Sequence, residues 1–365
     1  MNDAAVVGRL IREYHLRSPR PPRVRRLHGS VRGTSVTYHV QGDGQAPYIV
    51  RAFRADGSVI AQFGDSAAET VVDWLVSRAS TLRFLEESGY AAPRPVRVRS
   101  GELVGETGPW LTWATTVVDG PVLAPSQDQL RMLGGALGRL HSVLLPGPGQ
   151  GPGPGRAAWH PEAAVPVTLT RLAKVAPLIP ADWRPMHAAF VATAQAVRAA
   201  AGTLPRGLVH GDAWPGNGVQ TGANEVTLTD WEAAGLGLPV LDLGYCLAEC
   251  HLDSGLPPDQ PEAWLVQPDE ERIAAVTDGY SAVRDLSAAE RDLLPEAVRF
   301  GAAFAGAIHF EAALTGDAGG PSMDARLARL RNRLAVSDTV AQLARPHLPA
   351  AGLARTTEAQ DEGTQ

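Results

Sequence analysis

The chain has 365 residues, of which 44% are hydrophobic and 20% are charged, and its net charge is −6 at pH 7. This length and hydrophobic content suit a globular protein with one large domain or two smaller ones, and the negative charge argues against nucleic acid or an anionic membrane surface as a partner. The sequence has no run of about eighteen apolar residues and no N-terminus typical of a signal peptide, so we expect a cytoplasmic protein without a membrane span.

The first stretch of the chain predicts a helix followed by antiparallel strands. Residues 4–15 carry apolar side chains at helical spacing and predict the helix. Residues 24–27, 35–40 and 47–53 predict three strands. A turn at Asp43–Gly44 connects the last two strands as a hairpin. The chain therefore begins as a small antiparallel sheet.

The sheet continues after a second helix. Residues 66–88 have a helical pattern. Residues 96–98 and 109–118 then predict a strand pair around a turn at Gly101. A long helix over residues 126–145 follows. We therefore expect the sheet to end close to the residue where this helix begins.

The remainder of the chain is mainly helical in pattern. Residues 146–155 alternate proline and glycine and predict a surface loop inserted between helices. Helical periodicity then recurs in residues 166–178, 181–202, 241–252, 268–283, 287–314 and 322–343. Residues 351–365 are small and polar, so we expect them to be a disordered tail.

The residues best suited to chemistry lie between the second and third of these helices, 181–202 and 241–252. A short apolar strand, Leu208–Val209, leads into His210-Gly-Asp212, and Asn217 follows after four residues. A hairpin then delivers Asp230 at a strand end, close to the other two polar residues. Two carboxylates and an amide oxygen suit a hard cation such as Mg²⁺. If these residues only capped turns or began a strand, their joint spacing would be unexplained.

The spacing of these residues matches that of kinase catalytic motifs. A His-x-Asp unit, four further residues and an Asn, followed by a second Asp on the next strand pair, supply a catalytic Asp and two metal ligands in kinases. Glycine stands between the His and the Asp here, and Gly-Leu-Pro-Val-Leu-Asp-Leu-Gly follows at residues 237–244. With these features the chain resembles the aminoglycoside phosphotransferase and choline kinase superfamily.

The resemblance implies a protein-kinase-like, two-lobed α+β fold. Residues 1–118 would form a small N-terminal lobe with an antiparallel β-sheet, which binds the nucleotide. Residues 119–350 would form a larger, mainly helical C-terminal lobe with the catalytic and substrate-binding residues. ATP and Mg²⁺ would bind between the lobes.

The resemblance also assigns roles within the catalytic stretch. Asp212 would accept the proton of the acceptor hydroxyl, while Asn217 and Asp230 would hold Mg²⁺ on the triphosphate. His210 would brace the catalytic loop, and Asp242, at the start of the following helix, would orient it.

The loop after the first strand is the expected cover for the ATP phosphates. Gly29, Ser30, Gly33 and Thr34 are small enough for their backbone amides to approach phosphate oxygens. An ordinary glycine-containing turn explains these residues equally well.

Two further contacts with the nucleotide follow from the resemblance. Arg51 on the third strand would bind the α- and β-phosphates through its two-pronged guanidinium, although an exposed edge-strand arginine is the alternative. The acidic partner of this arginine would be Glu69 or Asp73, on the helix that follows. Thr116 and Val118 would hydrogen-bond the adenine at the hinge between the lobes, or simply form a strand end.

The acceptor is expected to be a small hydroxyl compound with a positive charge. Glu249 lies seven residues after Asp242, two helical turns along the same face, and further acidic residues follow it. These charges would attract an amine-bearing acceptor, such as an aminoglycoside or other antibiotic, and disfavour a phosphorylated or carboxylated one. A solvated acidic helix face is the alternative.

Other functions remain compatible with the motifs. The acceptor class could be a choline- or homoserine-type amino alcohol or a sugar. A pseudokinase would bind nucleotide without turnover, and a carboxylate-based metal hydrolase would use the same three polar residues without a nucleotide lobe.

Overall fold

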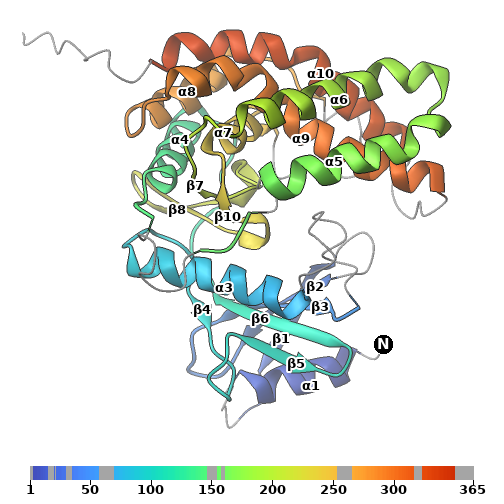
Figure 1. The fold of residues 1–365 in the computed structure, drawn as a ribbon. Coiled ribbons are helices and arrows are strands. Elements are labelled where there is room, and N and C mark those ends of the chain that lie inside the picture. Colours follow the sequence, from blue (N-terminus) through green and yellow to red (C-terminus); the bar gives the residue numbers. More distant parts are fainter. Residues whose placement is uncertain are drawn as a thin grey trace, which may run out of the picture.

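The computed structural model describes residues 3–14, 20, 22–29, 35–56, 70–145, 154–157, 161–252, 265–315 and 323–349. Figure 1 shows a lobe that contains the sheet beside a larger helical lobe. The helices are α1 Asp3–Glu13, α3 Val71–Glu87, α4 Gln127–His141, α5 Pro161–Val175, α6 Arg184–Ala200, α7 Pro239–Glu249, α8 Glu270–Ser281, α9 Ala288–Thr315 and α10 Met323–Ala344. The strands are β1 Arg23–Gly29, β2 Ser35–Gln41, β3 Tyr48–Arg54, β4 Pro95–Val96, β5 Val104–Thr107, β6 Trp110–Thr116, β7 Gly207–Val209, β8 Gly218–Gly222, β9 Glu225–Leu228 and β10 Gly235–Gly237.

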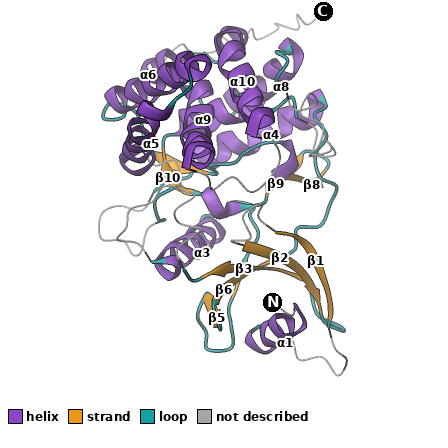
Figure 2. Cartoon of the chain, turned by 90° about the vertical axis from the view of Figure 1, so that its right-hand side faces the viewer, coloured by secondary structure: helices purple, strands orange, loops and turns teal. Residues whose placement is uncertain are grey.

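The N-terminal lobe is an antiparallel sheet covered by a helix on each face. Its strand order is β1-β2-β3-β6-β4, and β5 pairs with β6. Alternate residues of β3 face opposite sides: Val50 packs in one buried cluster with Leu10 of α1, while Phe53 meets Trp74 of α3 edge-to-face at 5.6 Å. Figure 2 shows α3 on the side of the sheet that faces the helical lobe. Arg51 lies two residues before Phe53 on β3, so both side chains are on the same face of the sheet. The side chain of Arg51 therefore points toward the helical lobe.

The sheet differs from its prediction at one hairpin. The strand pair expected around Gly101 is instead two separate pairings: β5 with β6 across a turn at Gly108, and β4 with the far end of β6. Gly108 has a φ of 61°, which glycine adopts without strain. The strand β5 was not predicted, because Gly105 interrupts its pattern of apolar residues. A Cβ at Gly105 would lie 2.8 Å from Thr112 Oγ1 on the paired strand, so only glycine fits there.

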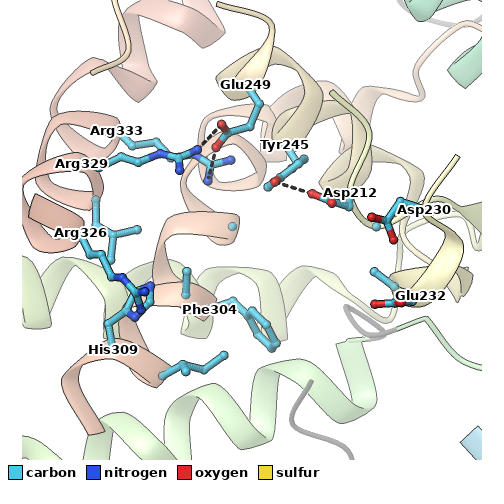
Figure 3. Close-up of a pocket in the computed structure, with 16 residues that line it drawn as sticks. Asp212, Asp230, Glu232, Tyr245, Glu249, Phe304, His309, Arg326, Arg329 and Arg333 are labelled. Carbon is cyan, nitrogen blue, oxygen red and sulfur yellow. Dashed lines mark hydrogen bonds and ion pairs between the residues drawn. The ribbon is translucent and has the colours of Figure 1, made fainter. Parts of the chain in front are cut away.

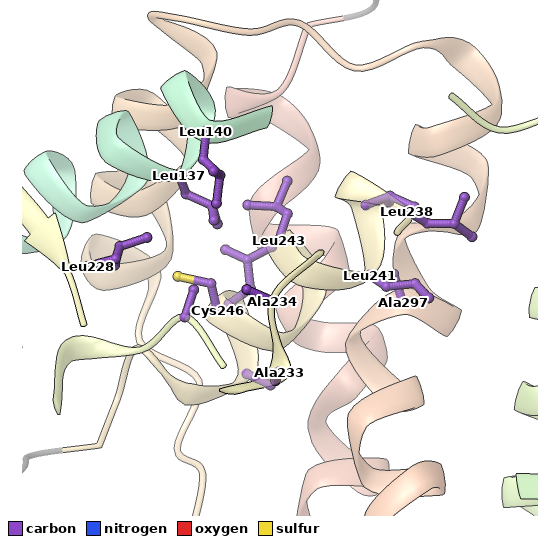
Figure 4. Packing of buried hydrophobic residues seen from close by; sticks show 14 of the residues in the cluster. Leu137, Leu140, Leu228, Ala233, Ala234, Leu238, Leu241, Leu243, Cys246 and Ala297 are labelled. Atoms are coloured by element: carbon purple, nitrogen blue, oxygen red, sulfur yellow. The ribbon is translucent and has the colours of Figure 1, made fainter. Parts of the chain in front are cut away.

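Helix α7 is the central helix of the C-terminal lobe. Ten of its 11 residues are buried, and their apolar side chains pack against α4 and α9 (Figure 4). Gly244 allows α9 to approach closely, because a Cβ there would lie 2.4 Å from the carbonyl carbon of Ala297. Asp242 and Glu249 are buried on this helix, and buried carboxylates require partners.

A second close helix contact joins α4 to α8. A Cβ on Gly279 would lie 1.9 Å from the carbonyl oxygen of Arg131, so the helices can approach this closely only with glycine at this position. Replacement of glycine by alanine in an open helix adds about 1 kcal/mol of stability. Gly279→Ala should instead lower the free energy of unfolding by about 1–3 kcal/mol, because the added methyl group pushes the helices apart.

Chemical denaturation measures this difference. Gly202→Ala is the control, because nothing lies within 4 Å of a Cβ at that turn position. Equal stability of Gly279→Ala and the parent protein would contradict the packing described here.

The helices predicted in this half are present, but several of their bounds differ from the prediction: α4 ends at His141 and not at 145, and α6 starts at Arg184 and not at 181. Helix α5 begins at Pro161 and not at 166, and α7 begins at Pro239 and not at 241. Proline is favourable in a first helical turn, so both helices start on one. Of the loop predicted at 146–155, residues 146–153 lie outside the described residues, as do residues 350–365. Within the described part of the chain, no helix is long and apolar enough to cross a membrane.

Candidate active site

The loop after β7 is held in place by the first turn of α7. One oxygen of the Asp242 carboxylate accepts the backbone N–H of His210 at 2.6 Å, and the other accepts that of Gly211 at 2.9 Å. Gly211 has a φ of 81°, and a Cβ there would lie 2.6 Å from the carbonyl oxygen of Ala233. The loop therefore requires glycine at this position.

Two histidines complete this support. The ring of His210 bonds the carbonyl of Thr229 at 2.8 Å through Nε2, while Nδ1 accepts the N–H of Asp212. His141 of α4 reaches Asp242 at 3.1 Å and the hydroxyl of Tyr280 at 2.8 Å. Burial lowers the pKa of both imidazoles, which favours their neutral form.

Asp242 itself remains ionised. Burial raises the pKa of its carboxyl, but the hydrogen bond from His141, the nearby histidines and the backbone N–H of His210 outweigh this and lower the pKa. Asp242 and His210 thus both bond backbone groups at the loop. The supporting role expected for them stays a prediction.

Asp212 projects from this loop with both carboxylate oxygens hydrogen-bonded. Tyr245 of α7 donates its hydroxyl to Oδ1 at 2.6 Å, and Asn217 donates its side-chain N–H to Oδ2 at 2.8 Å. Burial, together with the charge of Asp230, raises the pKa of Asp212 to about 7 despite these two hydrogen bonds. The carboxyl can therefore exchange a proton near neutral pH, as a general base must.

The structure brings Asn217 and Asp230 together as potential metal ligands. Asn217 uses its amide nitrogen on Asp212, which leaves the amide oxygen for a cation. Asp230 has a φ of 66°, a left-handed conformation that aspartate tolerates, and begins the turn Trp231–Ala233. Among the described residues there is no cluster of three His, Cys, Asp or Glu that could hold a metal alone. The amide oxygen of Asn217 and the carboxylate of Asp230 fit a hard cation that also takes phosphate oxygens and water as ligands.

Arg51 points across the interlobe space to two carboxylates of the helical lobe. Its guanidinium bonds Asp230 at 2.7 Å and also Glu232. Burial would lower the pKa of Arg51, but the charges of these two acids raise it, so the side chain stays charged. A phosphate must compete with both acids for this guanidinium.

The acidic partner of Arg51 is not Asp73, which was one of two predicted candidates. Asp73 instead caps the start of α3, where its carboxylate bonds Thr70. Glu69, the other candidate, lies outside the described residues. Helix α3 contributes Arg78 in place of an acid: its Nε donates to the carbonyl of Glu232 at 2.9 Å and so positions the turn that carries the actual partner.

Three of the predicted nucleotide residues, Arg51, Thr116 and Val118, line a cavity between the lobes. This cavity, of about 370 Å³, is also lined by Asn217 and Asp230. The backbone N–H of Thr116 already donates to the carbonyl of Arg94 at 2.9 Å. An adenine contact from this residue must therefore use its carbonyl oxygen.

The glycine loop can be followed only in part. Gly29 ends β1 and pairs with Val36 of β2. Leu27 of the same strand lines the interlobe cavity. Ser30, Gly33 and Thr34 lie outside the described residues.

Asp230 also lines a second cavity, of about 570 Å³ (Figure 3). Asp212, Asp230 and Glu232 line one part of it. Glu249 also lines it, but its two carboxylate oxygens already bond Arg329 at 2.5 Å and Arg333 at 2.9 Å.

Several residues of this site were not predicted. Tyr245 lies one helical turn after Asp242, and Glu232 lies two residues after Asp230, so proximity in sequence could have indicated both. The arginines of the second cavity are Arg326, Arg329 and Arg333. Their spacing of three and four residues marks one helix face, but nothing local indicates that this face meets the catalytic loop.

Comparisons with known proteins agree with this geometry. Homoserine kinase of Hyphomonas neptunium is 29% identical over 219 residues, which cover 58% of this chain and 63% of that protein, so less than two thirds of the relative is matched. The solved structure of amicoumacin kinase hAmiN, in complex with AMP-PNP, Ca²⁺ and Ami, has a TM-score of 0.63 at 16% identity and covers 96% of both chains. A microcompartment-associated aminopropanol kinase has a TM-score of 0.55 at 16% identity and covers 95% of this chain and 98% of that one.

These structural likenesses confirm the predicted two-lobed, kinase-like α+β fold. The sequence itself matches a family model over residues 30–286, which include the sheet lobe from β2 onward and the whole catalytic stretch. The chain therefore belongs to the phosphotransferase enzyme family.

Proposed function

We propose that the protein is an ATP-dependent kinase that transfers the γ-phosphoryl group to the hydroxyl of a small amino alcohol, with Mg²⁺ as cofactor. The observation that carries the proposal is the arrangement of the two cavities. Asp230 lines both of them, while Asp212 lines only the second one. A nucleotide in the first cavity and an acceptor in the second would meet where these two carboxylates lie.

The residues of the chain supply positioning and proton transfer. Asp212 accepts the proton of the acceptor hydroxyl as the oxygen attacks phosphorus, and Tyr245 and Asn217 hold its carboxylate in place. Arg51 binds phosphate oxygens once it exchanges its acidic partners for the nucleotide. A divalent cation at Asn217 and Asp230, when bound, would neutralise phosphate charge.

An amino alcohol is the acceptor class that agrees best with the relatives. One is named a homoserine kinase, and a structural neighbour is named an aminopropanol kinase. Another neighbour was solved with AMP-PNP and Ca²⁺, which supports a nucleotide triphosphate and a divalent cation as the partners of this fold.

ADP release tests the function directly. The protein is incubated with ATP and Mg²⁺, with and without a panel of small alcohols, amino alcohols and sugars. The proposal expects ADP release that depends on an amino alcohol and matches the amount of phosphorylated product. ADP release without an acceptor would indicate a hydrolase, and nucleotide binding without any ADP release would indicate a pseudokinase.

The role of Arg51 gives a separate prediction. Arg51→Lys keeps the positive charge but loses the two-pronged geometry, so we expect the KM for ATP to rise by about tenfold, the effect of one charged hydrogen bond. The KM for the acceptor should not change. Arg54→Lys is the control, because Arg54 lies on the same strand and its exposed side chain pairs with Asp56. An unchanged KM for ATP in Arg51→Lys would remove Arg51 from the nucleotide site.

A further inference from the structure

The second cavity has a basic wall on helices α9 and α10. Arg326, Arg329 and Arg333 lie on one face of α10, and His309 of α9 joins them. We call these four residues the basic wall. Figure 3 shows them in the same cavity as Asp212.

The basic wall is connected to the catalytic aspartate by a single side chain. The guanidinium of Arg333 lies 4.9 Å from the ring centre of Tyr245, and the hydroxyl of this tyrosine donates to Asp212. One small molecule in the cavity can therefore contact both the basic wall and the catalytic carboxylate.

Three arginines of this wall line the cavity. Two of them, Arg329 and Arg333, engage the two carboxylate oxygens of Glu249. Arg333 is only 4% exposed, yet its Nε and Nη2 have no hydrogen-bond acceptor among the described residues. A buried guanidinium with unused donors favours an anionic ligand nearby.

We propose that the basic wall binds a carboxylate of the acceptor, whose hydroxyl is held at Asp212. This inference rests on the proposed function and narrows the acceptor from amino alcohols in general to those that carry a carboxylate, the hydroxy amino acids. Glu249 then orients the arginines of the wall and does not itself bind the acceptor. Arginine suits the task because its fork matches a carboxylate.

This inference reverses the expectation drawn from the acidic sequence after Glu249. The described acids of that stretch, Asp269, Glu270 and Glu271, lie at the start of α8, and none of them lines the second cavity. Residues 253–264 lie outside the described part of the chain.

A set of four matched alcohols tests the inference. L-homoserine carries both an amine and a carboxylate, 3-aminopropan-1-ol lacks the carboxylate, 4-hydroxybutanoate lacks the amine, and propan-1-ol lacks both. Binding is measured by calorimetry on the full chain with Mg²⁺ and a non-hydrolysable ATP analogue. L-homoserine should bind at least about tenfold more tightly than 3-aminopropan-1-ol, and 4-hydroxybutanoate at least about tenfold more tightly than propan-1-ol, the effect of a charged hydrogen bond. Equal or tighter binding of 3-aminopropan-1-ol, or no binding of any of the four, would overturn the inference.

Replacement of one arginine of the basic wall tests whether the carboxylates bind there. Arg326→Gln removes one charge without breaking the pairs of Glu249 with Arg329 and Arg333, and it should weaken binding of the two carboxylates by about tenfold. The KM for ATP should stay the same. Arg331→Gln is the control, because Arg331 is exposed on the same helix and does not line the cavity. Unchanged carboxylate binding in Arg326→Gln would also overturn the inference.

Turnover is measured separately, so that the two proposals can fail separately. If the carboxylates bind through Arg326 but no ADP is released, the kinase function fails and the carboxylate site stands. If 3-aminopropan-1-ol is phosphorylated in preference to homoserine, the kinase function stands and the carboxylate site fails.

Discussion

Replacement of Asp212 by asparagine is expected to lower kcat by about 10²–10⁴-fold, the usual contribution of a positioned general base. Asparagine keeps the shape of the side chain but cannot accept the proton of the acceptor hydroxyl. The KM for ATP should change little, because Asp212 lines the second cavity and not the interlobe cavity. Initial rates of ADP release under saturating ATP measure the effect.

Asp212→Asn could lower activity in two ways, by removing the base and by changing the orientation of the Asn217 amide. A second variant separates these two causes. An asparagine at position 212 can place its own amide N–H groups against those that Asn217 now donates to Asp212. Rotation of the Asn217 amide would then remove its oxygen from the metal site. Asp212→Ala avoids this conflict and should lose as much activity as Asp212→Asn.

The control for both variants is Asp182→Asn, which changes an exposed aspartate in the helical lobe. Melting curves of all three variants establish that the fold is kept. Near-normal kcat in Asp212→Ala would show that another group accepts the proton.

The catalytic stretch could be predicted because its geometry is local. Asp212, Asn217 and Asp230 lie within nineteen positions of one another on a short hairpin, so the strand and turn pattern alone brings them together. The supporting role of Asp242 also follows from sequence, because it lies in the first turn of the next helix. Local order, strand alternation and turn residues are properties that a sequence pattern reports well.

The partner of Arg51 could not be predicted in this way. The resemblance pointed to an acid on the next helix, but the structure supplies Asp230 and Glu232, which are 179 and 181 positions away along the chain. That pairing depends on how the two lobes are placed, and on Arg78, which holds the turn that carries Glu232. Periodicity within one element carries no information about such a contact.

The contacts of Glu249 in the helical lobe also could not be predicted from the sequence. Its helix face was predicted from its spacing with Asp242, and both side chains are indeed buried on α7. Its surroundings were not predictable, because Arg329 and Arg333 come from α10, about eighty positions later. A carboxylate that seemed open to an amine is paired with two guanidinium groups once the helices pack.

Asp230→Asn is expected to lower turnover by about 10²-fold or more, because the stabilisation that a metal gives to transferred phosphoryl charge is worth several kcal/mol. Asparagine tolerates the left-handed backbone at this position, where φ is 66°, so the turn should persist. Alanine would add backbone strain at this position, so the loss of the carboxylate could not be separated from a change in the turn. The variant therefore removes the carboxylate with little change in the shape of the loop.

Nucleotide binding with and without metal identifies the cause of this loss. Calorimetry with AMP-PNP should show weaker binding in Asp230→Asn when Mg²⁺ is present, because the carboxylate acts through the cation. Without Mg²⁺ the variant should bind the nucleotide as well as the parent protein or more tightly, because a negative charge next to the phosphates has been removed and Arg51 has lost one competing partner.

Glu232→Gln is the matched control for this experiment. It also removes an acidic partner of Arg51, but Glu232 does not line the interlobe cavity, as the proposed metal ligands Asn217 and Asp230 do. Tighter binding of metal-free nucleotide should therefore appear in both variants, whereas weaker binding with Mg²⁺ should appear only in Asp230→Asn. If Asp230→Asn weakens binding equally in both conditions, its carboxylate serves the fold of the turn and the cation must be held elsewhere.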